Sequence, residues 1–159
     1  MSNKLSKCLA LSAVAGALAV AGCGSSSDEG PSAEDAQKEY AQVSDNLTDF
    51  GAKLQAEVAS IPGKSDAELA PEFDALAQEA NKQIMALKEI EVPEDVTEAR
   101  DNLADAIGDG VDDLKAIADA GKTHDADAAA ASFKKLVADS QDIDAAKKEL
   151  KEALSKAAN

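Results

Sequence analysis

The sequence predicts an all-α protein: an antiparallel four-helix bundle of up-down-up-down order that follows a cleaved signal peptide and a flexible tether. Three observations support this prediction. An apolar stripe with helical spacing recurs four times, proline and glycine separate the four segments, and no segment alternates with the two-residue period of a strand. Short connections between long helices favour antiparallel neighbours. We therefore expect one four-helix bundle domain over residues 33–159.

Capping residues and a proline delimit the first two predicted helices. The first carries its apolar stripe over residues 36–61, can be capped by Ser32, and ends at Pro62. Ser65 and Glu68 have the spacing of a capping box at the start of the second helix. These signals predict two helices joined by a short loop.

The remaining boundaries depend on proline, glycine and aspartate. Because Pro71 falls inside the start of the second helix, we expect a short turn over residues 66–70 and a main helix that opens at Pro71. Pro93 suits the first turn of the third helix, and Gly121 is the expected C-terminal stop of that helix. Asp125 is the expected N-cap of the fourth. The larger stripe residues, which we expect to form the core, are Tyr40, Val43, Leu47, Phe50, Leu54, Val58, Ile61, Phe73, Leu76, Ile84, Leu87, Ile90, Val96, Leu103, Ile107, Val111, Leu114, Phe133, Leu136, Ile143, Leu150 and Leu154.

The start of the chain has the features of an exported protein's leader. Lys4 and Lys7 precede an uncharged, mostly apolar run over residues 8–22. This run is too short for a membrane-spanning helix, which needs about 20 residues. A basic start, an apolar middle and an end of small residues are typical of a secretory signal peptide.

The end of this leader is more specific. Val20-Ala21-Gly22-Cys23 resembles the lipobox of bacterial lipoproteins, in which an aliphatic residue and two small residues precede an obligatory cysteine. The resemblance implies that Val20, Ala21 and Gly22 form the signal cleavage site and that Cys23 is the lipidation site. It implies a covalent diacylglyceryl group on the Cys23 thiol, with fatty chains such as palmitate and optionally a further acyl group on its amine. It also implies a lipid-anchored protein on the extracytoplasmic face of a bacterial cell membrane.

The leader divides the chain into functional parts. We expect a lipoprotein signal peptide at residues 1–22, and the lipidated cysteine with a flexible linker at residues 23–32, which are rich in glycine and serine. Two fatty chains hold a protein stably at a membrane, whereas one holds it only marginally. Cys8 would leave with the leader and Cys23 would be alkylated, so no disulfide or cysteine-bound metal is expected in the mature protein.

The charge of the chain restricts the class of partner. The sequence has 16 Lys and Arg against 31 Asp and Glu, a formal net charge of −15. Loss of residues 1–22 removes two lysines and no acids, so the charge becomes −17. This acidity argues against nucleic-acid binding, which requires clustered basic residues. The partners we expect, besides the membrane through the lipid anchor, are an envelope protein, a peptide or a cation attracted at long range.

An acidic run in the third helix is the one weak candidate for a metal site. The EF-hand pattern is absent, and the apolar residues keep helical spacing through the run, as on a solvated helix face. Gly108 and Gly110 each cost about 1 kcal/mol in a helix interior, which close helix contact or a kink would explain. A bend there could instead present the carboxylates to a cation or a basic partner. The candidate residues are Asp105, Asp109, Asp112 and Asp113.

No set of catalytic residues can be assembled from the sequence. His124 is the sole histidine and lies in a predicted exposed loop. A Ser-x-x-Lys motif at Ser132 and Lys135 lacks its companion motifs. We therefore expect no enzyme and no cofactor other than the lipid on Cys23. The expected function is a membrane-anchored, non-enzymatic binding or scaffolding module with an acidic surface; the alternative is an accessory protein that binds a small solute or a divalent cation.

Overall fold

The computed structural model describes residues 30–159, and this part of the chain is almost entirely helical. The predicted signal peptide, the cleavage residues and Cys23 lie outside these residues. The four α-helices of the described range are α1 (Ala33–Ser60), α2 (Asp66–Glu89), α3 (Thr97–Thr123) and α4 (Ala126–Ala157). Two 3-10 turns, Ile61–Gly63 and Glu94–Val96, precede α2 and α3. Residues 30–159 contain no strand, so the all-α class and the four helices are confirmed.

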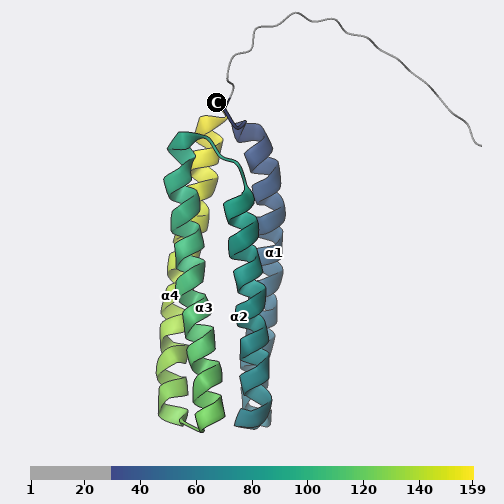
Figure 1. Ribbon diagram of the computed structural model, residues 1–159, viewed down its shortest axis with the longest axis vertical. Helices are drawn as coiled ribbons and strands as arrows, with labels where there is room; N and C mark the ends of the chain where they lie inside the picture. Colours follow the sequence, from purple (N-terminus) through teal and green to yellow (C-terminus); the bar gives the residue numbers. More distant parts are fainter. Residues whose placement is uncertain (1–29) are drawn as a thin grey trace, which may run out of the picture.

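The four helices lie side by side in a long bundle (Figure 1). Each helix runs opposite to the one before it, and the end of α4 lies beside the start of α1. Two hydrogen bonds join these first and last helices: Gln37 Nε2 donates to the Leu154 carbonyl at 3.0 Å, and the Tyr40 hydroxyl donates to the Lys147 carbonyl at 3.2 Å. Helix α3 packs closely against both α2 and α4, whereas α1 makes fewer contacts with its neighbours.

Three helices start directly after their predicted capping residues, Ser32, Ser65 and Asp125. The Glu68 carboxylate accepts hydrogen bonds from the Ser65 backbone N–H at 2.9 Å and from its hydroxyl at 2.7 Å, as in a capping box. The Asp125 carboxylate accepts from the Ala128 N–H at 2.9 Å at the start of α4. Ser32 precedes α1, but its side chain makes no capping hydrogen bond. The predicted N-cap position of Ser32 is therefore confirmed, whereas the predicted side-chain cap is wrong.

Two predicted helix starts, at Pro71 and at Pro93, are wrong. At Pro71 the reason is that a helix can continue through a proline in its second turn. Helix α2 begins at Asp66 and continues through Pro71, so the short turn over residues 66–70 is part of the helix. Pro71 lies in the second turn, where its missing N–H removes one hydrogen bond while the capping box holds the first turn. The third helix begins at Thr97, after a 3-10 turn, and not at Pro93.

Gly121 does not end α3, as predicted, but lets it approach α2. A Cβ atom at Gly121 would lie 3.3 Å from both the Ala70 Cβ and the Asp66 carbonyl oxygen of α2. The helix ends two residues later, and His124 adopts the left-handed conformation with φ of 56°. Its N–H donates to the carbonyls of the preceding turn, so His124 takes the role that usually falls to glycine.

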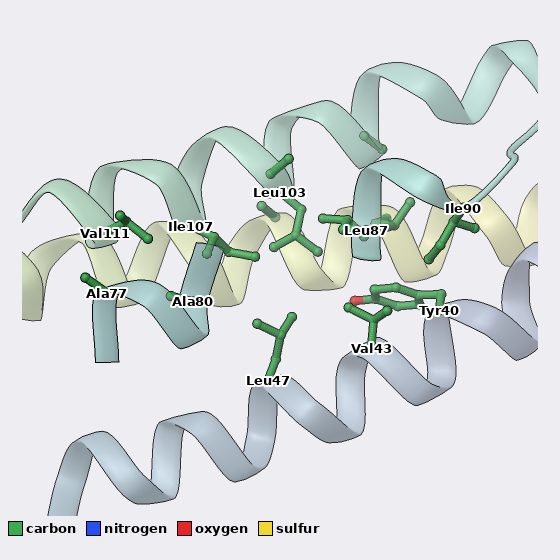
Figure 2. Close-up of a cluster of buried hydrophobic side chains, with 14 of the residues drawn as sticks. Tyr40, Val43, Leu47, Ala77, Ala80, Leu87, Ile90, Leu103, Ile107 and Val111 are labelled. Atoms are coloured by element: carbon green, nitrogen blue, oxygen red, sulfur yellow. The ribbon is translucent and has the colours of Figure 1, made fainter. Parts of the chain in front are cut away.

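The core runs between the helices and contains side chains from all four. Figure 2 labels core residues on α1, α2 and α3 and at Ile90. Phe73, Leu87 and Leu103 are fully buried. Alanine occupies many of the contact positions on α2 and α3, which allows these helices to pack closely. Of the aromatic residues, Tyr40 and Phe73 are buried, whereas Phe50 and Phe133 are partly buried and pack against the core. Most of the predicted core is thus confirmed, with its best-packed part around α3. The predicted core residues that are only partly buried are Phe50, Leu54, Val58, Ile61, Ile84, Phe133 and Ile143.

Candidate functional site

The four acidic candidates of the third helix do not form one exposed cluster. Helix α3 is continuous through Gly108 and Gly110, and the chain makes no break there that would gather the carboxylates. Asp113 is buried, with 5% of the residue exposed, while the other three candidates are exposed. Gly110 is buried against α4, but a Cβ atom there would make only ordinary contacts with Ile143 and Leu136, so no close helix approach requires glycine at this position. Gly108 faces open space, and no packing contact requires it.

Two of the exposed candidates, Asp105 and Asp109, line an acidic groove between α3 and α4. The groove has a volume of about 360 Å³, is open to solvent, and contains five carboxylates with no basic side chain. We call it the acidic groove. Its lining residues are Asn102, Asp105, Ala106, Asp109, Asp139, Asp142, Ala145, Ala146 and Glu149. Three of its carboxylates thus belong to α4 and were not candidates from the sequence.

Most of the charge in the acidic groove is not compensated within the described residues. Asp105, Asp109, Asp142 and Glu149 make no ion pair there; Asp139 pairs with Lys135 of its own helix. Asp105 and Asp109 are four residues apart, so they are neighbours on one helix face and repel each other by roughly 0.2–0.5 kcal/mol. The groove therefore has a strongly negative potential that a cationic group would relieve.

Asp113 lies at the seam between α3 and α4, beside one wall of the acidic groove. Lys135 Nζ lies 3.0 Å from Asp113 Oδ1 and 3.2 Å from Asp139 Oδ2, so one ammonium bridges the two helices. Asp113 Oδ2 is buried and has no hydrogen-bond partner among residues 30–159. Burial raises the pKa of Asp113 above its ordinary value; the hydrogen bond from Lys135 lowers this pKa, and Asp139 raises it again, first through a hydrogen bond with the protonated Asp113 side chain and then through its negative charge. The Asp113 carboxylate is thus incompletely satisfied.

The remaining sequence candidates lie elsewhere. His124 is exposed, as expected, and its Nδ1 lies 2.9 Å from Oδ2 of Asp66 at the opposite end of the bundle from the chain terminus. Lys135 of the Ser-x-x-Lys motif is engaged with carboxylates. Within residues 30–159, no group of at least three His, Cys, Asp or Glu side chains is arranged to hold a metal ion. No helix of this range is long and apolar enough to cross a membrane.

The carboxylates that α4 contributes to the acidic groove could not be predicted from the acidic run of the third helix alone. Asp139, Asp142 and Glu149 follow helical spacing along one face of α4, which is a weak signal in a chain with so many acids. These three residues lie opposite Asp105 and Asp109 because of the register of α4 against α3, and no sequence pattern predicts that register.

Comparisons with protein-family models, with curated proteins and with solved structures give no match to this chain.

Proposed function

We propose that this chain is a lipid-anchored, non-enzymatic binding or scaffolding module on the extracytoplasmic face of a bacterial membrane. The helices, taken in up-down-up-down order, serve as its scaffold. The lipobox ending at Cys23 supports the anchor. The observation that carries the binding role is the acidic groove, in which four of the five carboxylates have no ion-pair partner among the described residues.

The proposed mechanism is presentation of an acidic surface at a fixed location. The fatty chains on Cys23 hold the molecule at the membrane, and the linker over residues 23–32 separates the bundle from it. The net charge of −17 that remains after loss of residues 1–22 attracts a basic protein or peptide at long range, and the acidic groove receives its cationic side chains. This attraction weakens as salt shortens the Debye length.

Binding is tested with a fluorescent lysine-rich peptide and the full chain in mild detergent at low salt. The triple variant Asp105→Asn, Asp109→Asn, Asp142→Asn should bind about tenfold more weakly, because three exposed ion pairs contribute roughly 0.2–1 kcal/mol each. The matched control removes three exposed acids of α1 through Glu39→Gln, Asp45→Asn and Asp49→Asn. Equal losses in both triple variants would refute the acidic groove as the binding surface.

The anchor is tested by cell fractionation. Cys23→Ala should move the protein out of the membrane fraction and abolish incorporation of a labelled fatty acid, since the variant has no thiol to alkylate. Cys8→Ala, which changes the other cysteine, should leave both unchanged. Recovery of the Cys23→Ala protein in the membrane fraction would refute the lipid anchor.

A calcium titration separates this proposal from cation binding. A ligand that binds only the folded state must raise the melting temperature. We expect no rise at millimolar calcium. A clear rise that Asp109→Asn abolishes would support the alternative of a divalent-cation accessory protein in place of a peptide-binding module.

A further inference from the structure

Asp113 combines deep burial with an unpaired oxygen at the edge of the acidic groove. Its side chain is 7% exposed and meets Lys135 and Asp139, both on α4. Asp139 also lines the acidic groove, so the Asp113 carboxylate adjoins that groove. Buried carboxylate oxygens normally accept hydrogen bonds, and each exception requires an explanation. Asp113 Oδ2 accepts none among the described residues.

Lys135 shows that a cationic group fits between these two carboxylates. Its ammonium contacts one oxygen of each, and its side chain is 58% exposed, so it can leave the seam without disturbing the core. An ammonium is a compact charge, and here it reaches Oδ1 of Asp113 but not Oδ2. A guanidinium presents five N–H donors in a planar fork and bonds carboxylates through two parallel hydrogen bonds.

We propose that the Asp113 end of the acidic groove is a guanidinium site, in which an arginine of a basic peptide replaces Lys135 and donates to Asp113 and Asp139 together. This inference rests on the proposed function and names its partner: an arginine-bearing peptide segment. Lys135 then acts as an internal occupant that competes with the partner. A partner lysine would repeat the contacts of Lys135 and leave Asp113 Oδ2 unpaired.

The dimensions of the acidic groove set the length of the segment. Because α3 and α4 are antiparallel, Asp109 and Asp139 lie at one end, and Asn102 and Glu149 at the other; Asp113 lies one helical turn beyond Asp109. Residues 102–113 of α3 span about 16 Å at 1.5 Å per residue. An extended peptide covers this distance with about five residues at roughly 3.3 Å each. The occupant is thus a short extended segment with an arginine near one end and further basic residues along the groove.

The test compares two fluorescent peptides of equal length and charge, penta-arginine and pentalysine, bound to the full chain in mild detergent at low salt. Lys135→Ala removes the internal occupant and should raise affinity for penta-arginine about tenfold. Lys134→Ala, the same charge change on the adjacent exposed residue, should raise the affinity for both peptides slightly and equally. Equal effects of the two alanine variants on penta-arginine binding would overturn the guanidinium site.

A second variant addresses the carboxylate. Asp113→Asn keeps the shape of the side chain and should abolish the preference for arginine over lysine, whereas Asp112→Asn, its exposed neighbour, should keep it. One outcome is that the wild type and the variants at Lys134, Lys135, Asp112 and Asp113 each bind the two peptides with equal affinity, while the acidic-groove triple variant loses binding. In that case the guanidinium site is wrong and the proposed function stands. If neither peptide binds the wild-type protein at low salt, the proposed function itself fails.

Discussion

The three buried or half-buried glycines of α3 allow a quantitative test of its packing. Replacing a helix-interior glycine with alanine stabilises a helix by about 1 kcal/mol when the new methyl group has room. At Gly108 an added Cβ meets no atom within 4 Å, so Gly108→Ala should raise the free energy of unfolding by about 1 kcal/mol. At Gly110 the nearest atoms, on Ile143 and Leu136, lie at 3.6 and 3.7 Å, which is ordinary contact. Gly110→Ala should therefore stabilise by about 1–2 kcal/mol, because the methyl group is also buried.

Gly121→Ala should behave differently from the other two. Its Cβ would lie 3.3 Å from the Ala70 Cβ and from the Asp66 carbonyl oxygen, and neither atom can yield unless α2 shifts. An overpacking cost of about 1–3 kcal/mol offsets or exceeds the gain in helix propensity. Urea denaturation followed by circular dichroism measures all three variants. Equal stabilisation by the three alanines would refute the close approach of α3 to α2 and leave helix propensity as the only effect.

Three further predictions concern the core, the caps and the buried acid. Leu103→Ala removes a fully buried side chain and should cost about 2–5 kcal/mol in urea denaturation, whereas Leu54→Ala, at a partly buried position, should cost clearly less. Asp125→Ala should lower the free energy of unfolding by about 1 kcal/mol through loss of its cap, while Ser32→Ala should change it by less than about half of that; equal costs would contradict the assigned caps. Because burial raises the pKa of Asp113, its contribution to stability is greatest below the ordinary aspartate pKa and is lost as the pH rises through the raised value. Asp113→Asn should thus gain in stability relative to the wild type between mildly acidic and neutral pH, and a constant difference across melts in this range would count against the buried acid.

The fold could be predicted because its signals are local. The spacing of apolar residues marks the four helices, and the capping box of Ser65 and the cap of Asp125 act within one helical turn. The error at Gly121 arose because residues distant in the sequence decide its role, whereas the error at Pro71 arose within a single helix. Gly121 looks like a helix stop in sequence, yet its role is to admit Ala70 of α2 at close range. Pro71 looks like a helix start, yet the surrounding helix absorbs its missing hydrogen bond.

The candidate site could be predicted only in part for a related reason. Asp105 and Asp109 were recognisable because they stand in a dense acidic run. Asp113 belongs to the same run, but only the packing of α4 against α3 separates it from its exposed neighbours. The bridge from Lys135 to Asp113 joins residues 22 positions apart, and it follows from the register of two antiparallel helices. Local periodicity determines which face of a helix is buried, but not which residue of the next helix lies opposite.

The contact between Gln37 and Leu154 places both ends of the described chain at one pole of the bundle. A polypeptide whose ends meet can be re-joined head to tail and opened elsewhere. A short glycine-serine bridge from residue 159 back to residue 30, with a new start directly after the exposed Gly63, should leave the helix packing intact. Such a circular permutant would carry its attachment point on the link between α1 and α2, and any domain fused there would enter at the opposite pole of the bundle.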